Sequence, residues 1–175
     1  METFFLICAL GVATAGAVQD VRSQRIPNWL TYSGLVVALT IRCVLSGWPG
    51  LKSGFAGVLV GGGIFFLLFL VGGMGGGDVK LMAAVGAWAG AERALLILIA
   101  TAIAGGMLGL CYMVFRKQVV ATLLNTAELI RHHLTSGLRP HPVLNIQEPG
   151  SMRVPFGLAI ALGTLYCAGN VVWRG

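Results

Sequence analysis

Long apolar runs separated by short polar segments make up most of this chain. Most of the runs approach or exceed the ~17–25 apolar residues with which an α-helix crosses a bilayer. None shows the alternation of apolar and polar residues, in segments of about ten, that marks a transmembrane β-barrel. The pattern predicts an all-α fold, a polytopic membrane helical bundle with about six transmembrane helices. The expected spans lie at about 3–19, 29–47, 54–72, 79–90, 93–115 and 154–173.

Two of these spans carry further expectations. The run 79–90 is too short, at 1.5 Å per residue, to reach across a hydrocarbon core ~30 Å thick. It therefore crosses with the help of a tilt and its flanks, or it is partly re-entrant. The first run lacks the basic stretch that precedes a cleavable signal peptide, so we expect it to remain as the first membrane helix.

Composition excludes a soluble globular protein. Of the 175 residues, 57% are hydrophobic and 10% are charged, whereas about 25% are charged in an ordinary soluble domain. The length suits one domain, 1–175. A net charge of +6 would elsewhere suggest nucleic acid, but the basic residues are scattered between the apolar runs. We therefore expect a lipid bilayer around the protein and no nucleic-acid partner.

The distribution of Lys and Arg predicts the orientation in the membrane. Cytoplasmic loops are enriched in these residues, and placing 20–28 in the cytosol puts most of them on that side. Both termini then face outward. The cytosolic set is Arg22, Arg25, Lys80, Arg116, Lys117, Arg131, Arg139 and Arg153; Lys52, Arg93 and Arg174 lie opposite, with Arg42 near the outer end of the second span.

The one long polar segment, 116–153, is expected to be a cytosolic loop. Apolar residues within it recur at spacings of three and four, which indicates an amphipathic helix lying on the membrane surface. Pro140, Pro142 and Pro149 break regular structure after it. The apolar positions are Val120, Leu123, Ala127, Ile130 and Leu134.

The cysteines and histidines form no recognisable metal site. Each cysteine lies inside an apolar run, outside any C-x-x-C pair, and is interpreted as a small core residue. The histidines lack the i, i+4 spacing of a helical metal pair and are interpreted as solvated. We expect no metal and no cofactor. The residues are Cys8, Cys43, Cys111, Cys167, His132, His133 and His141.

Glycines four positions apart recur along the chain, a spacing that lets helix backbones approach closely. Close packing is therefore their simplest interpretation. The pairs are Gly50 with Gly54, Gly57 with Gly61, Gly86 with Gly90, and Gly105 with Gly109.

The chain contains two aspartates, and both fall where a span meets the cytosolic side. Asp20 ends the first span, and Asp78 opens the fourth after a glycine-rich stretch. A single acid at a helix boundary is often a cap or a solvated charge. Two aspartates at the same membrane face instead favour a functional pair of carboxyl groups.

Two carboxylates that share one proton can hydrolyse a peptide without a metal or a covalent nucleophile. One activates water while the other protonates the carbonyl oxygen or the leaving group. The glycines before Asp78 leave backbone unshielded, which could let an extended substrate pair with it. Tight packing and a turn explain these glycines equally well.

Three motifs resemble those of the type IV prepilin peptidases. Gly75-Gly76-Gly77-Asp78 followed by Val-Lys-Leu resembles the second aspartate motif, and Asp20 followed by basic residues and Ile26-Pro27-Asn28 resembles the first. Pro155-Phe156-Gly157 resembles the opening of the family's closing helix. The resemblance covers about 1–115 and 150–173.

The resemblance implies an aspartic endopeptidase of the bacterial inner membrane that removes the cytosolic leader from pilin-like precursors. Asp20 and Asp78 match the catalytic pair, and we assign Gly75, Gly76, Gly77 and Lys80 to substrate binding. Long family members add a four-cysteine portion and methylate the product. This chain lacks paired cysteines and resembles the short form of tight-adherence (Flp) pilus systems.

Other residues of the first loop have simpler interpretations. Arg22 and Arg25 are topology anchors, although one of them, or Lys80, could stabilise an ionised aspartate. Pro27 and Asn28 predict a turn and a cap for the second helix.

Two alternatives stay open. A small ion-coupled transporter, or a non-catalytic scaffold for pilus assembly, would also be apolar and helical, but coupling acids tend to lie near the bilayer midplane. A presenilin-type protease normally has Tyr before its first aspartate, whereas Gln19 precedes Asp20 here.

Overall fold

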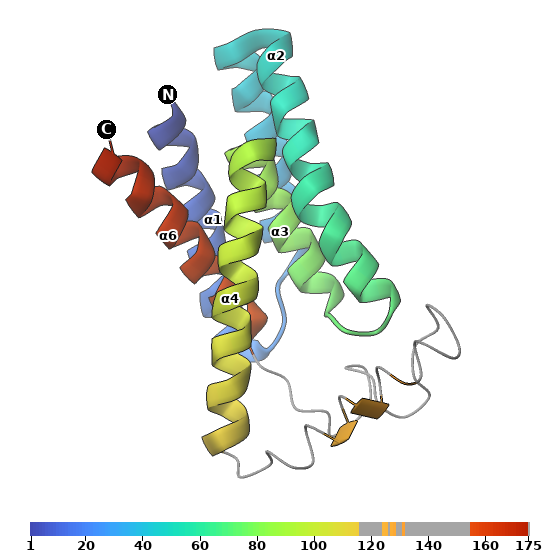
Figure 1. Cartoon of the computed structure of the whole chain (residues 1–175). Helices are drawn as coiled ribbons and strands as arrows, with labels where there is room; N and C mark the ends of the chain where they lie inside the picture. Colours follow the sequence, from blue (N-terminus) through green and yellow to red (C-terminus); the bar gives the residue numbers. More distant parts are fainter. Residues whose placement is uncertain (116–123, 126, 129–130, 132–154, 175) are drawn as a thin grey trace.

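In the computed structural model, residues 1–115, 124–125, 127–128, 131 and 155–174 are described. The chain forms helices α1 (Glu2–Ser23), α2 (Asn28–Leu70), α3 (Gly76–Ala89), α4 (Ala91–Phe115) and α6 (Phe156–Arg174) (Figure 1). No strand occurs in these described ranges, and the all-α prediction is confirmed. The surface helix expected within 116–153 falls almost entirely outside them.

In the described part of the chain, four helices are long and apolar enough to cross a membrane, namely α1, α2, α4 and α6. The 43-residue α2 is two arms joined at a kink, because Gly47 has φ 61° and ψ −150° and Pro49 follows it. A proline lacks the N–H that a continuous helix would use. The arms correspond to the expected second and third spans, so the described helices supply five apolar arms of this kind beside the shorter α3, and the estimate of about six is approximate.

The arms of α2 turn back sharply at Gly50, which lies against the backbone carbonyl of Arg42 and the Cβ of Ser46. A side chain at this position would collide with the preceding turn. Figure 1 shows both chain ends on one side of the bundle, with the connections 24–27 and 71–75 at the opposite side. The arrangement agrees with termini that share a membrane face.

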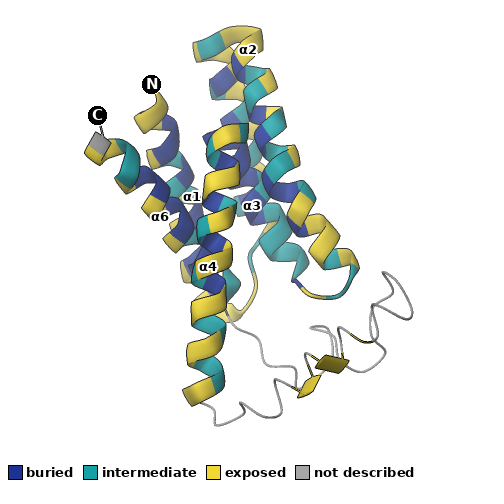
Figure 2. Ribbon diagram, in the orientation of Figure 1, coloured by how far each residue is buried: buried dark blue, intermediate teal, exposed yellow. Residues whose placement is uncertain are grey.

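The short helix α3 forms the centre of the bundle. It has 14 residues, and those from Ala84 to Ala89 are all buried (Figure 2). At 1.5 Å per residue α3 is only ~21 Å long. The predicted fourth span is therefore a helix enclosed by protein, and α4 follows it after the single residue Gly90, whose φ is 81°.

Glycines bring α2 against α3, as their spacing predicts. Gly57 lies in backbone contact with Gly86, and a Cβ on Gly61 would be 2.9 Å from the carbonyl oxygen of Met82. Gly105 contacts the ring of Phe156, whereas Gly109 has open space around it. The packing interpretation is thus confirmed for the first three pairs and for one member of the last.

The outward surface is apolar, as a lipid environment requires. Large exposed side chains cover α2 and α4 in particular, among them Leu59, Ile103 and Leu110. Cys43 and Cys111 are also exposed, so the interpretation of all four cysteines as core residues is wrong for these two. Only Cys167 is buried.

At the end of the bundle that carries the termini, the guanidinium of Arg42 is buried. Its Nε and Nη2 donate to the carbonyl oxygen of Trp88 at 3.2 and 2.7 Å, and its Nη1 donates to Ser53 Oγ at 3.3 Å. The same group lies 4.4 Å from the ring centroid of Phe5. Carbonyl groups in the last turn of a helix have no N–H partner within the helix. Arg42 supplies the missing donor for the carbonyl oxygen of Trp88 in the last turn of α3.

Candidate active site

Asp20 lies on the inward face of α1, near its end. The buried residues of this helix recur every three or four positions, and Asp20 continues the series at 8% exposure. The helix stops three residues later because Gln24 adopts a left-handed conformation and its N–H bonds to the carbonyl oxygen of Asp20. The periodicity that packs α1 thus also turns a carboxylate into the bundle. The other members of the series are Ala9, Ala13, Gly16 and Ala17.

Asp78 lies in the first turn of α3 and is half-buried. Gly75 is the N-cap residue in an extended conformation, and its backbone N–H bonds to the Asp78 carboxylate. An acid that reaches back in this way resembles one half of a capping box. Asp78 therefore does contribute to capping α3, as the simpler interpretation of an acid at a helix boundary expects.

The two aspartates come together where α1 packs on α3. The negative charge of Asp20 acts on the Asp78 carboxyl. The approach depends on Gly16, because a Cβ there would be 2.6 Å from a methyl carbon of Leu81. Two neighbouring carboxylates cannot both ionise without a penalty, so the pair favours holding one proton between them.

A third element, α6, reaches the same place. The N–H of Gly157 donates to Oδ2 of Asp20 at 2.8 Å. Phe156 holds the start of this helix against α2, with its ring centroid 5.8 Å from that of Phe65. Gly157 was not among the predicted site residues, although the Pro155-Phe156-Gly157 motif could have indicated it.

The glycines before Asp78 serve several local purposes. A Cβ on Gly75 would be 3.0 Å from Oδ2 of Asp78, and one on Gly77 would be 3.3 Å from Cβ of Ile26. Gly77 therefore lets the start of α3 approach the connection that follows Asp20. Gly76 and Gly77 already belong to α3, and the carbonyl oxygen of Gly75 accepts the N–H groups of Asp78 and Val79, so backbone for pairing with an extended substrate is confined to residues before Gly75.

Lys80 is held on the start of α2. Its Nζ donates to Asn28 Oδ1 at 3.0 Å and lies 5.4 Å from the ring centroid of Tyr32. Pro27 is the N-cap of α2, with no side-chain cap bond, so the prediction that Asn28 caps the helix is wrong in detail. Arg22 and Arg25 are exposed, in agreement with a role as anchors.

Within the described residues, no group of three or more His, Cys, Asp or Glu side chains could hold a metal ion. The three histidines of the chain fall outside those residues. Among the described residues, Asp20 and Asp78 are therefore the acids that we consider as catalytic groups, because their carboxyl groups interact.

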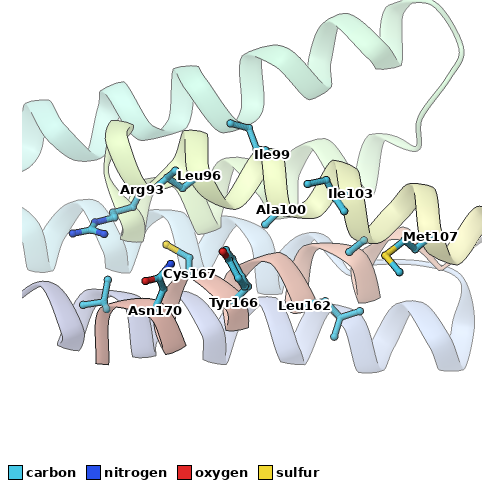
Figure 3. A pocket seen from close by; sticks show the side chains of 12 residues that line it. Arg93, Leu96, Ile99, Ala100, Ile103, Met107, Leu162, Tyr166, Cys167 and Asn170 are labelled. Carbon is cyan, nitrogen blue, oxygen red and sulfur yellow. The ribbon is translucent and has the colours of Figure 1, made fainter. Parts of the chain in front are cut away.

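A groove of about 900 Å³ lies between α4 and α6, away from the aspartates (Figure 3). Its walls are mainly apolar, with Ile103, Met107 and Leu162 along its length, and Arg93, Tyr166 and Asn170 supply its polar groups. None of the residues that line it is acidic. The groove therefore lacks the groups for acid–base hydrolysis, and the candidate site remains the aspartate pair.

The fold and the site describe a helical membrane protein with two carboxylates brought together at one end of its bundle. The model of the type IV leader peptidase family matches residues 4–110, more than half of the chain. The protein belongs to this family. Neither the curated proteins nor the solved structures compared with the chain include a match.

Proposed function

We propose that this peptidase-family protein is an aspartic endopeptidase that removes the cytosolic leader from prepilin-like precursors, with Asp20 and Asp78 as its catalytic residues. The observation that carries the proposal is that the structure brings these two carboxyl groups near enough for the charge of Asp20 to act on Asp78. They lie 58 positions apart in sequence and meet because α1 packs on α3. The family match supports peptidase chemistry, and both aspartates fall inside the matched region.

Hydrolysis at this pair needs one ionised and one protonated carboxyl. The ionised carboxylate takes a proton from water, whose oxygen bonds to the scissile carbonyl carbon while the other carboxyl protonates the carbonyl oxygen. In the second step, the leaving nitrogen takes the proton that came from water, and the C–N bond breaks. One hydroxyl of the diol returns its proton to the other carboxylate, so both groups recover their starting states.

The location of the pair supports a substrate whose cleaved bond lies at the membrane surface. Asp20 is near the end of α1 and Asp78 is in the first turn of α3, both on the side of the connections 24–27 and 71–75. Such a position suits a precursor with a polar leader followed by an apolar membrane segment. The motifs, in a sequence without paired cysteines, support a pilin of the tight-adherence (Flp) type as the proposed substrate.

Gly75 precedes Asp78 and Lys80 follows it in the first turns of α3, and these two residues are proposed to contact the precursor. Gly75 is extended and adjoins Asp78, and because its N–H and its carbonyl oxygen are both bonded within the start of α3, it would contact the precursor by van der Waals packing. Lys80 presents an ammonium group fixed by Asn28. Gly76 and Gly77, which are proposed with them, lie in the first turn of α3, where Gly77 also lets the helix begin close to Ile26 of the first loop.

The direct test is purified protein in lipid nanodiscs with a Flp-type precursor, in the presence of a chelator and without S-adenosylmethionine. We expect one cut between leader and apolar segment, and a mature product with an unmodified amino terminus, read by intact mass. An intact precursor would contradict the peptidase proposal and favour the transporter or scaffold alternative. A product heavier by one methyl group would contradict the proposed short-form chemistry.

The proposed orientation has its own test. With the native cysteines replaced, cysteines are introduced at Thr3 and at Ser23, which are both exposed but lie at opposite ends of α1. An impermeant thiol reagent added to intact cells should label position 3 and spare position 23. The reverse pattern would place the aspartates outside the cytosol.

A further inference from the structure

The start of α6 lies outside the region that the family model matches, 4–110, yet it bonds directly to one of the paired aspartates. The first N–H groups of a helix have no acceptor within the helix. The N–H of Gly157 is such a group, and it donates to Oδ2 of Asp20 at 2.8 Å. The bond therefore satisfies both partners without removing any hydrogen bond from α6.

Glycine at this position leaves the space that the carboxylate occupies. A Cβ on Gly157 would lie 3.0 Å from Cβ and 3.1 Å from Oδ2 of Asp20, and 3.4 Å from Cα of Ala17. The first two separations are shorter than ordinary van der Waals contact. Even one methyl group at 157 would therefore push the Asp20 side chain away from its position.

Neighbouring residues fix the direction in which this N–H points. Phe156 packs on Phe65, and its ring fits against Gly105, where a Cβ would be 2.6 Å from it. The next residue, Leu158, donates its N–H to the carbonyl oxygen of Pro155 at 3.2 Å. The donor is thus presented by a turn that contacts both α2 and α4.

We propose that Gly157 is a positioning residue for the aspartate pair, whose N–H engages Oδ2 of Asp20 and directs Oδ1 to the proton transfers of peptide cleavage. The proposal rests on the proposed peptidase function and adds α6 to its machinery. A carboxylate fixed at one oxygen keeps one orientation through both protonation steps. Orientation of this kind matters because a displacement of ~1 Å can lower a rate about 10²-fold.

The same N–H favours the ionised state of Asp20, because a donor to a carboxylate stabilises its charged form. Among the described residues, the other charged groups around it are few. Asp78 faces it from α3, while Lys80 of that helix bonds to Asn28. Arg22 and Arg25 are exposed, and the first two turns of α6, 156–163, contain no ionisable side chain. Removing the donor should therefore shift the pH at which cleavage begins.

The experiment replaces Gly157 with glycolic acid during cell-free synthesis into nanodiscs, which exchanges the N–H for an ester oxygen and adds no bulk. We expect kcat for precursor cleavage to fall about tenfold, KM to change less than twofold, and the acidic limb of the kcat–pH profile to move to higher pH. Gly157→Ala, which displaces Asp20, should lower kcat about 10²-fold.

Gly169→Ala is the matched control, because Gly169 lies in the same helix with open space around it. It should cleave at the rate of the unmodified protein. If the unmodified protein cleaves and the ester form matches its kcat and pH profile, Gly157 has no positioning role although the peptidase function stands. A loss of folded protein with unchanged kcat per folded molecule would also overturn the proposal. Absence of cleavage by the unmodified protein would instead overturn the peptidase function and this proposal with it.

Discussion

At one end of the bundle the buried guanidinium of Arg42 is surrounded by groups that complement it: a carbonyl of α3, the hydroxyl of Ser53 and the face of the Phe5 ring. At the other end the buried carboxylate of Asp20 receives one N–H, from Gly157, and its charged neighbour is another carboxylate, Asp78. The positive charge of Arg42 is thus matched by its surroundings, whereas the negative charge of Asp20 lies near a second acid.

The difference separates a structural charge from a reactive one. A buried charge with good partners holds elements together, and removing its partners leaves unsatisfied polar groups. Two acids held close to each other by packing gain nothing in stability from their mutual repulsion, and such arrangements cluster at functional sites. We therefore expect substitutions at the Arg42 end to change stability, and those at the aspartate end to change activity.

The largest effect is expected from Asp20→Asn and Asp78→Asn. Each should lower precursor cleavage about 10³-fold or more, because Asn keeps the size of Asp but neither takes nor returns a proton. Thermal unfolding in detergent should change little, since an Asn side chain keeps an oxygen that can accept the N–H of Gly157 or of Gly75. Glu128→Gln, at an exposed position, is the matched control and should retain activity. Unfolding of either Asn variant would assign the pair a structural role instead.

Arg42→Met should have the opposite profile. The change leaves the carbonyl of Trp88 and the hydroxyl of Ser53 without their donor, and each buried unsatisfied group costs ~1–3 kcal/mol. We expect a clear fall in unfolding temperature with kcat per folded molecule preserved. Arg42→Lys keeps the charge but cannot donate from a planar fork, so it should recover only part of the stability. A folded but inactive Arg42→Met protein would contradict the assignment of stability to the Arg42 end and activity to the aspartate end.

Lys80→Met should have a smaller effect, on substrate binding. Because Lys80 lies in α3 two residues after Asp78 and its ammonium group is held by Asn28, its loss is expected to raise KM severalfold with kcat changed less than twofold. Steady-state kinetics with varied precursor measures this split. Asn28→Ala releases the ammonium without removing it and should show the same direction more weakly. A fall in kcat at constant KM would instead indicate that Lys80 acts on the aspartates.

Glu2→Gln should have the smallest effect. Glu2 pairs with Arg93 at 3.0 Å, but its side chain is 74% exposed, and exposed ion pairs contribute only ~0–1 kcal/mol. Unfolding temperature and cleavage rate should both stay close to those of the unsubstituted protein. A large loss of stability would show that charges at this end contribute more than their exposure suggests.

Much of the fold follows from the sequence because apolar length and glycine spacing are local properties. The runs at 3–19 and 93–115 became α1 and α4 with small changes at their ends, and Gly57 and Gly86 meet as their spacing predicts. The enclosure of α3 was less accessible, because an apolar run of about a dozen residues looks the same whether lipid or protein surrounds it.

The two aspartates of the site could be predicted from the sequence, but the contacts that hold them and their neighbours in place could not. Asp20 and Asp78 stand out because they are the aspartates of an apolar chain and lie within motifs. The bond from Gly157 is made by a backbone N–H, so the one sequence feature that could have indicated it is the Pro155-Phe156-Gly157 motif. The bond between Lys80 and Asn28 depends on how α2 and α3 pack, so the pattern of Pro27 and Asn28 indicated only a helix start. Arg42 was expected near the outer membrane face, and its burial depends on the turn at Gly50.

The most direct test of the central claim, that Asp20 and Asp78 act as one unit, is a double-substitution cycle on cleavage. Wild type, Asp20→Asn, Asp78→Asn and the double variant are measured at equal folded concentration in one nanodisc preparation, with leader release followed by mass. Residues that act together are non-additive. We expect both single variants to lose nearly all activity and the double variant to be scarcely slower than either. Robust cleavage by one single variant, or losses that multiply in the double variant, would contradict the account.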